Sequence, residues 1–283
     1  MTDPASTNAL HFRVLEDIAK DLSGDVNFPT YLDASLTVRN VLKDPLVSVD
    51  KVAQVVGVEP LIASKLLRLA NSVAYSGAGK TISDLRQAIQ RVGFETVRTT
   101  SLSVAMEQML RSRNLVAFED IARLTWEHSL QVAAIGRVLA RRIGRVNPED
   151  AMLAGMVHDI GVFYLLYRAA EYPEYKNCRE DLLSLVIGWH ESIGESLLTA
   201  LGLPDHIISA IREHDQLKHV ANPCSLADVL YFANLLAGGN FEWLGQTSGQ
   251  ADTEQTAADR ARYADLLDEA WDDIRAIQAA LST

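Results

Sequence analysis

The sequence has little cysteine. Its 283 residues include only Cys178 and Cys224, and these do not form a Cys-x-x-Cys pair. Two cysteines are too few for a disulfide framework and fit a reducing cytoplasm. The amino terminus, MTDPASTNAL, lacks the Lys- and Arg-rich start of a secretion signal, and no later stretch is an uninterrupted apolar run of membrane length. We therefore expect a cytoplasmic protein that is neither secreted nor embedded in a membrane.

Positive charge is also scarce. Lys and Arg number 26 against 37 Asp and Glu, which gives a net charge of −11 at pH 7, and no stretch concentrates basic residues. The electrostatic field of a protein with this net negative charge repels nucleic-acid phosphates and anionic lipid, so we expect no direct binding to nucleic acid or to a membrane. The 48% hydrophobic content excludes a disordered or collagen-like chain and suffices for one large or two small domains.

The alternating apolar pattern of β-strands is missing, and a helical period replaces it. Ala63, Leu66, Leu67 and Ala70 fall at i, i+3, i+4 and i+7, and the same spacing recurs from Leu153 to Ile160. Further amphipathic stretches lie at residues 11–22, 33–43, 50–56, 84–92, 96–111, 118–142, 180–200, 205–214 and 225–237. A final helix is marked by Leu267, Ala270, Trp271, Ile274 and Ile277. These patterns predict an all-α protein.

The histidines divide the chain. His11 is the sole histidine before residue 128, and the other six lie between residues 128 and 219. We predict three parts: an N-terminal helical subdomain over residues 1–112, a helical bundle with the candidate site over 113–237, and a loop with a C-terminal helix over 238–283. The loop is expected at 238–256, and the last helix is expected to dock on the body.

Imidazoles and carboxylates recur in the second part in a pattern that favours a metal site. His158 follows an apolar helical face and precedes Asp159, while His190 follows Val186 and Ile187 at helical spacing. A buried neutral imidazole needs a partner, usually a carboxylate or a metal ion. A mixed nitrogen and oxygen ligand set suits Mn²⁺, Fe²⁺ or Zn²⁺, or Mg²⁺ with more oxygen ligands. A carboxylate such as Asp159 would be able to bridge two ions that act together on a phosphoester.

A metal-free interpretation of the same residues stays open, in which they form a buried hydrogen-bonded network. Three further histidines, His11, His206 and His219, fit no pattern and are expected at the surface. Asn71 and Ser72 end an apolar helix, and we expect them to cap it rather than to catalyse a reaction.

The order of these motifs resembles the HD superfamily of helical metal-dependent phosphohydrolases, and more specifically its HDOD (HD-related output domain) family. Residues 64–76 (SKLLRLANSVAYS) are similar to the N-terminal HDOD signature, as are several positions that follow them: Ile82, Leu85, Ala88, Ile89, Val92 and Gly93. The later part of the family pattern is matched by His190, Gly194, Leu197, Leu198, Leu203, Pro204 and His214. The resemblance covers about residues 28–237.

The resemblance implies a bacterial signalling module with an HD-like bundle packed on a second helical subdomain. It also implies a site for one or two divalent ions (Fe, Mn, Zn or Mg), whose ligands would be His128, His158, Asp159, His190, His214 and Asp228. HDOD domains are mostly non-catalytic modules that bind partner proteins, although their fold resembles the HD-GYP phosphodiesterases of cyclic di-GMP.

Three departures bear on activity. Val162 stands where HD-GYP enzymes carry a lysine, residues 190–198 lack the Gly-Tyr-Pro stretch, and Asp215 replaces the second histidine of a His-His pair. The leading hypothesis is thus a regulatory module that binds a protein partner and retains a metal centre. The alternative is a metal-dependent phosphohydrolase or phosphodiesterase with a nucleotide or other phosphoester ligand.

Overall fold

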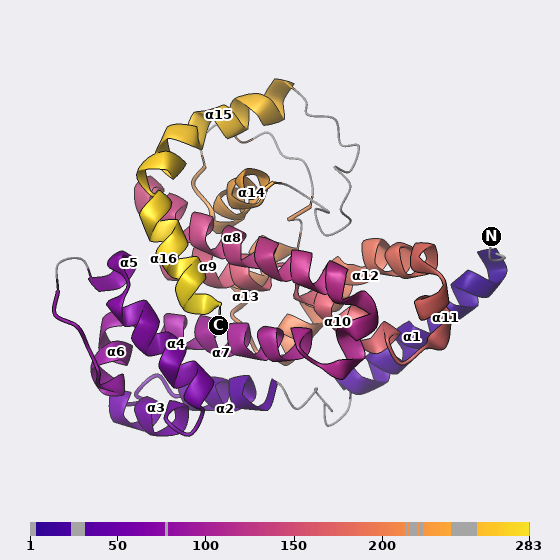
Figure 1. Ribbon diagram of the computed structural model, residues 1–283, viewed down its shortest axis with the longest axis horizontal. Coiled ribbons are helices and arrows are strands. Elements are labelled where there is room, and N and C mark those ends of the chain that lie inside the picture. Colours follow the sequence, from indigo (N-terminus) through magenta and orange to yellow (C-terminus); the bar gives the residue numbers. More distant parts are fainter. Residues whose placement is uncertain are drawn as a thin grey trace.

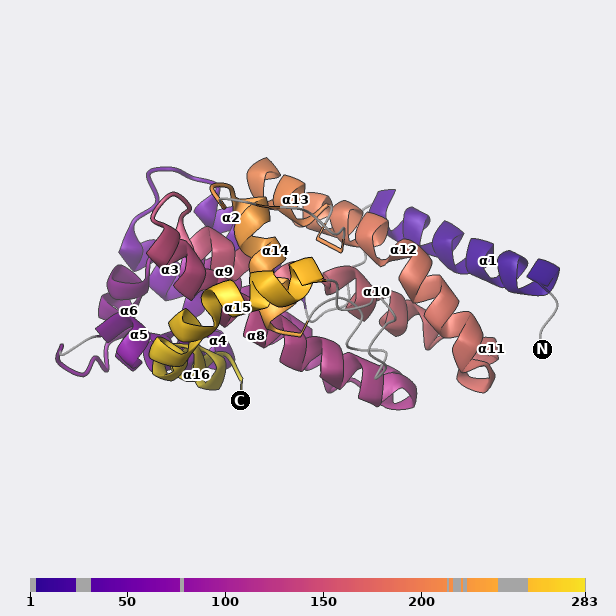
Figure 2. The same cartoon turned by 90° about the horizontal axis from the view of Figure 1, so that it is seen from above.

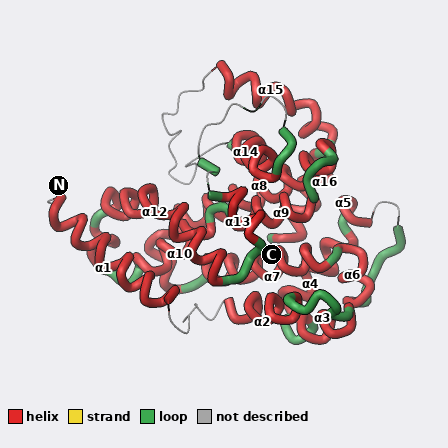
Figure 3. Tube along the Cα trace, turned by 180° about the vertical axis from the view of Figure 1, so that it is seen from behind, coloured by secondary structure: helices red, strands yellow, loops and turns green. Residues whose placement is uncertain are grey.

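The computed structural model describes residues 4–23, 32–76, 79–212, 214–215, 220, 223–238 and 254–282. All regular structure in these ranges is helical (Figure 3), which confirms the all-α prediction. The first elements are α1 (Pro4–Ser23), α2 (Asp33–Leu42), α3 (Val49–Val56), α4 (Pro60–Asn71), α5 (Val73–Ser76), α6 (Leu85–Val92), α7 (Phe94–Leu110) and the 3₁₀ helix η2 (Arg113–Phe118). They are followed by α8 (Glu119–Ile143), α9 (Pro148–Val157), α10 (Ile160–Ala169), α11 (Pro173–Asn177), α12 (Arg179–Ala200), α13 (Asp205–Ile211), α14 (Leu226–Leu236), α15 (Glu254–Glu269) and α16 (Trp271–Leu281). Among the described helices, none is long and apolar enough to cross a bilayer.

The centre of the molecule is the pair α8 and α9 (Figure 1). Helix α8 ends at Ile143 and is followed by Gly144, whose φ of 71° favours glycine, and the chain turns back into α9. The Asn147 side chain accepts a hydrogen bond from the Glu149 N–H and Pro148 occupies the first turn, so α9 has a well-defined start. A Cβ at Gly155 would lie 2.7 Å from the backbone of Ala133, which shows how closely the two helices approach.

Helices α2 to α6 form an N-terminal lobe (residues 32–92) on one side of α7 (Figure 1). Asn71, the last residue of α4, stabilises this lobe. Its amide donates to the carbonyl oxygens of Leu67 and Ile82 at 2.9 and 2.7 Å and accepts from the Ile82 N–H at 2.7 Å. The Ser72 hydroxyl donates to Leu69 O at 2.7 Å. Both side chains therefore cap the helix end, as expected.

Helix α1 packs on α10 and α12 of the second half rather than on the N-terminal lobe (Figure 2). This packing corrects one prediction, because His11 is buried and not at the surface. Its Nε2 lies 3.1 Å from Asp181 O, and its ring stacks on Tyr175. The exposed position expected for His206 is found, whereas His219 lies outside the described residues.

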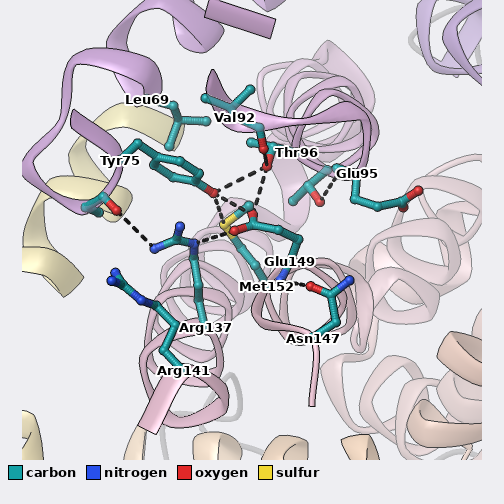
Figure 4. Close-up of polar contacts among 12 residues, drawn as sticks. Leu69, Tyr75, Val92, Glu95, Thr96, Arg137, Arg141, Asn147, Glu149 and Met152 are labelled. Atoms are coloured by element: carbon teal, nitrogen blue, oxygen red, sulfur yellow. Dashed lines mark hydrogen bonds and ion pairs between the residues drawn. The ribbon is translucent and has the colours of Figure 1, made fainter. Parts of the chain in front are cut away.

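A partly buried carboxylate, Glu149 of α9, ties the N-terminal lobe to the central helices (Figure 4). Glu149 accepts from the Tyr75 hydroxyl at 2.6 Å and from the Thr96 hydroxyl at 2.8 Å, and it pairs with Arg137 Nε of α8 at 3.0 Å. The Arg137 guanidinium lies over the Tyr75 ring, 3.9 Å from its centroid. Four helices, α5, α7, α8 and α9, thus share one polar network at the seam between the two halves.

The C-terminal helices form an arc along one edge, outside α14 and α8 (Figure 1). The apolar pattern predicted one final helix, but the structure separates α15 from α16 at Ala270. Helix α16 docks on the body through Ile274, Ile277 and Leu281, in contact with α8, α4 and α5. Lys65 donates to the carbonyl of Leu281 and pairs with Glu107 at 2.9 Å. The expected loop at 238–256 falls mostly in residues 239–253, outside the described part of the chain, and its last residues, 254–256, belong instead to the start of α15.

Candidate metal centre

Five of the six candidate ligands come together where five helices of the second half meet. His128 lies in α8, His158 follows the end of α9, Asp159 precedes α10, and His190 lies in α12. His214 lies just beyond α13, where its N–H bonds to Ile211 O at 3.0 Å. All five side chains are 2–4% exposed.

The helix is interrupted at His158 and Asp159, although the apolar pattern from Leu153 to Ile160 predicted one continuous helix. Asp159 leaves helical geometry, with φ −101° and ψ 18°, and the next helix starts at Ile160. The break places an imidazole and a carboxylate at one corner. Gly161 lets this corner approach α12, since a Cβ there would overlap the carbonyl oxygen of His190 and lie 2.8 Å from Gly194 N.

The four imidazoles form a continuous row of edge-to-face rings. The ring centroids are 5.2 Å apart for His128 and His158, 5.1 Å for His158 and His214, and 5.7 Å for His190 and His214. The Asp159 carboxylate lies between them, with Oδ1 3.2 Å from His214 Nε2 and Oδ2 3.4 Å from His158 Nε2. The row therefore has a carboxylate at its centre.

Three of the rings are held in the same orientation by their own helices. His158 Nδ1 lies 2.8 Å from Gly155 O, His190 Nδ1 lies 3.0 Å from Val186 O, and His214 Nδ1 lies 2.9 Å from Ile211 O. A carbonyl oxygen only accepts, so each Nδ1 carries the proton and donates. In the neutral ring the lone pair is then on Nε2, which faces the cluster, as in histidines that bind metals.

Burial and the neighbouring charges move the pKa values apart. Burial lowers the pKa of His158 to about 4, so this ring is neutral at pH 7. Burial also opposes charge on His214, but its hydrogen bond to Asp159 and the charge of Asp215 outweigh this effect and raise the pKa of His214 to about 9. Burial would raise the pKa of Asp159, yet the surrounding histidines hold it well below its usual value. Asp159 is consequently ionised.

These residues fit a divalent metal ion. His158 Nε2 is buried without a hydrogen-bond partner, and its lone pair faces an oxygen of the ionised Asp159 at 3.4 Å. Two acceptors in a dry site repel each other unless a proton or a cation lies between them. The ligand atoms of His128, His158 and Asp159 lie within 4.8 Å of one another, as do those of Asp159, His190 and His214. Asp159 belongs to both groups.

The HDOD domain family model matches residues 28–217, which is most of the chain. The chain belongs to the HDOD family. The fold is shared with a Shewanella amazonensis SB2B protein that is provisionally named a metal-dependent phosphohydrolase. It has 23% sequence identity and a TM-score of 0.77, and the match covers 98% of this chain and all of that one.

Two further relatives are longer than this chain, so that the match covers only part of each. A Marinobacter aquaeolei VT8 protein, provisionally named a signal transduction protein, has 20% identity and a TM-score of 0.59, with 97% of this chain and 66% of that chain covered. A curated Treponema pallidum protein described as uncharacterized is 24% identical over 211 residues, or 71% of this chain. This HDOD chain spans 40% of the length of that relative.

Asp228 is the candidate ligand that the HDOD fold does not bring to the cluster. Its carboxylate accepts from the N–H groups of Cys224 and Ser225 at 2.9 and 3.0 Å, and the Ser225 hydroxyl accepts from the Asp228 N–H. This is a capping box at the start of α14. The Ser-x-x-Asp spacing was a sequence signal for that role. Among the described residues, Asp228 belongs to no group of side chains with metal-ligand spacing.

Asp215 is a site residue that the sequence analysis noted only as a departure from the HD-GYP pattern. Its Oδ2 lies 2.8 Å from His190 Nε2, and its Oδ1 lies 3.3 Å from His214 Nε2. With His190 and Glu191 it forms a third group whose ligand atoms have metal spacing. The second His-Asp dipeptide of the sequence, residues 214–215, was the signal for it.

Proposed function

We propose that this HDOD protein is a regulatory signalling module that binds one or two divalent metal ions and acts by binding a protein partner. His128, His158, Asp159, His190 and His214 would hold the metal. The observation that carries the proposal is the buried His158 Nε2, whose lone pair faces the Asp159 carboxylate with no donor between them. A bound ion would supply the missing positive charge and link the helices that carry its ligands.

Two features favour a regulatory role over a catalytic one. The ligand side chains are nearly fully buried, which is typical of closed structural metal sites rather than of open catalytic ones. Val162, at the position of the HD-GYP lysine, is fully buried and offers no charge to a substrate. The provisional name of the Marinobacter relative points in the same direction.

Metal content tests the site. We expect about one or two equivalents of Fe, Mn or Zn in protein purified without added metal and without oxygen, and less than about a tenth of that in a His158→Ala Asp159→Ala variant. His206→Ala is the matched control, because this exposed histidine lies outside the cluster and should leave the content unchanged. Elemental analysis beside circular dichroism separates loss of metal from loss of fold. A wild-type protein that stays metal-free after soaking with all three metals would contradict the proposal.

Metal binding should also release protons. His214, with its pKa raised to about 9, is protonated at pH 7 in the metal-free protein, and a metal ligand must be neutral. His158 contributes no proton, because its pKa of about 4 leaves it neutral. We therefore expect at least about one proton released at pH 7 when the ion that His214 holds binds, and an affinity for that ion that rises up to about tenfold per pH unit between 7 and 9. Calorimetry in two buffers of different ionisation enthalpy measures this release, and zero release at pH 7 would be the contrary result.

Binding of a protein partner is tested with the metal-loaded and the metal-free forms of the protein. Wild-type protein, loaded with metal or stripped of it, is used as bait in extract of the native cell, with the His158→Ala Asp159→Ala variant alongside. A protein retained by the loaded form and not by the other two supports the regulatory role. Recovery of no such protein would overturn it.

A second function, a metal-dependent phosphohydrolase, is favoured by one observation. Two ligand groups share Asp159, as in two-ion sites where a carboxylate bridges the metals. In that case the metals would supply the activated water and stabilise the leaving oxygen. Hydrolysis of generic phosphoesters or cyclic dinucleotides with Mn²⁺ or Fe²⁺, above the rate of the double variant, would establish it.

A further inference from the structure

The five proposed ligands are too deeply buried for an ion to reach them directly from solvent. His128, His158, Asp159, His190 and His214 are each only 2–4% exposed. Moving a bare ion through an apolar wall is costly, because its charge loses hydration in a medium of low dielectric. A route to this centre therefore needs polar side chains that replace the lost water in steps.

The three groups with metal-ligand spacing form such a series. The two buried groups share Asp159, and the second of them shares His190 with an outer group that adds Glu191 and Asp215. Within each group the ligand atoms lie within 4.8 Å of one another. An ion that moves from one group to the next would thus keep a ligand that both groups contain.

The outer group lies at the protein surface. Glu191 and Asp215 are both partly exposed, and the Asp215 side chain is 11% exposed. One turn before Glu191 on α12, Ile187 is 45% exposed, and a Cβ on Gly188 would meet nothing within 4 Å. The face of α12 that carries Glu191 is therefore uncovered next to the buried centre.

Asp215 connects this open face to the buried ligands. Its Oδ2 lies 2.8 Å from His190 Nε2, and its Oδ1 lies 3.3 Å from His214 Nε2. These are the ring nitrogens that face the cluster, because each Nδ1 bonds to a backbone carbonyl oxygen instead. An ion held by Asp215 would lie next to the atoms that receive it.

We propose that Glu191 and Asp215 form the entry route through which a divalent ion reaches the buried metal centre. This inference rests on the proposed function, because the route leads to the centre proposed there. The two carboxylates attract the cation from solvent and supply oxygen ligands in place of part of its water shell. Such a residue changes how fast the ion enters and leaves, because it lowers the barrier in both directions, and it has little effect on the affinity of the final site.

Rates of Zn²⁺ uptake by the metal-free, full-length chain test the proposal. Zn²⁺ is the probe because it binds such sites more tightly than Mn²⁺ or Fe²⁺. Stopped-flow fluorescence of a Zn²⁺ indicator measures association, and mixing the loaded protein with excess chelator measures dissociation. In Glu191→Gln we expect both rate constants to fall about tenfold, while Kd changes less than about threefold. The fall in the association rate constant should shrink at high ionic strength, because salt screens an exposed carboxylate.

Glu180→Gln is the matched control. Glu180 is an exposed carboxylate on the same helix, eleven residues before Glu191. The separation along the helix axis is about 16 Å, which exceeds the screening length of about 8 Å at physiological ionic strength. This variant should change each rate constant less than about twofold. Asp215→Asn is the second route variant, and we expect its association rate constant to fall at least as much as that of Glu191→Gln.

The possible outcomes separate the route from the metal centre. Equal rate constants in wild type, Glu191→Gln and Asp215→Asn would overturn the route and leave the metal centre in place. An unchanged association rate constant with a tenfold higher Kd in Glu191→Gln would make Glu191 a ligand and would also overturn the route. A wild-type protein that binds neither Zn²⁺, Mn²⁺ nor Fe²⁺ would contradict the proposed function and the route with it. Circular dichroism checks that each variant is folded.

Discussion

Replacing Gly161 by alanine is expected to destabilise the protein by about 3 kcal/mol or more and to abolish the proposed metal binding. The new Cβ would overlap the carbonyl oxygen of His190 and lie 2.8 Å from the backbone nitrogen of Gly194. Both obstacles are backbone atoms of a buried helix, so no flexible side chain is able to move aside, and the cost falls at the upper end of overpacking effects. Because His190 is itself a candidate ligand, the helix that must shift is the one that carries it.

Thermal unfolding and elemental analysis together measure this effect. A loss of about 3 kcal/mol corresponds to a fall in Tm of very roughly 5–10 °C for a chain of this size. Gly188→Ala is the matched control on the same helix α12, since a Cβ there meets nothing within 4 Å. It should leave metal content unchanged and raise stability by about 0.5–1 kcal/mol. Equal stability of the two alanine variants would show that α10 and α12 do not approach as described.

Replacing Glu149 by alanine is expected to lower the free energy of unfolding by about 3 kcal/mol. Glu149 is the carboxylate partner of Arg137, whose side chain is 6% exposed. Removal of Glu149 leaves the positive charge of Arg137 in the interior without its ion-pair partner. The Tyr75 hydroxyl loses its 2.6 Å acceptor in the same step. Burial and the Glu149 charge raise the pKa of Tyr75, so it stays a proton donor and cannot compensate.

Denaturant unfolding measures the loss, with Glu127→Ala as the control. Glu127 also pairs with an arginine, Arg123 at 2.9 Å, but both side chains are more than half exposed. That variant should change stability by less than about 0.5 kcal/mol. Glu149→Gln keeps the size and part of the hydrogen bonding, so we expect it between wild type and Glu149→Ala. A Glu149→Ala protein as stable as the control would mean that the seam network contributes no net stability.

The fold class can be predicted from local sequence patterns, whereas the points at which helices are interrupted cannot. The helical apolar period was sufficient to predict most of the longer helices and an all-α fold, which the described part of the chain confirms, but it did not indicate α11 or most of α10. The same period runs through His158 and Asp159 and through Ala270, where the structure interrupts the helix. Tertiary contacts decide these interruptions, among them the approach of Gly161 to α12, and a periodic pattern does not report such contacts.

The candidate site shows the same division. Motif order and the HDOD resemblance pointed to His128, His158, Asp159, His190 and His214, which the structure brings together, and their role as ligands stays a prediction. Asp228 was included by motif order although its spacing to Ser225 predicts a helix cap, the role that it takes.

Helix α8 has a mechanical consequence for the site. It carries His128 and, nine residues later, Arg137, which Glu149 and Tyr75 hold at the seam. Nine residues of helix span about 14 Å, so a tilt of about 5° with Arg137 as the pivot moves His128 by about 1 Å. A working ligand set tolerates only about 0.5 Å. Helix α8 therefore connects the seam to His128, and any displacement of α8 imposed by the N-terminal lobe would change the distance between His128 and the ion that we propose it holds.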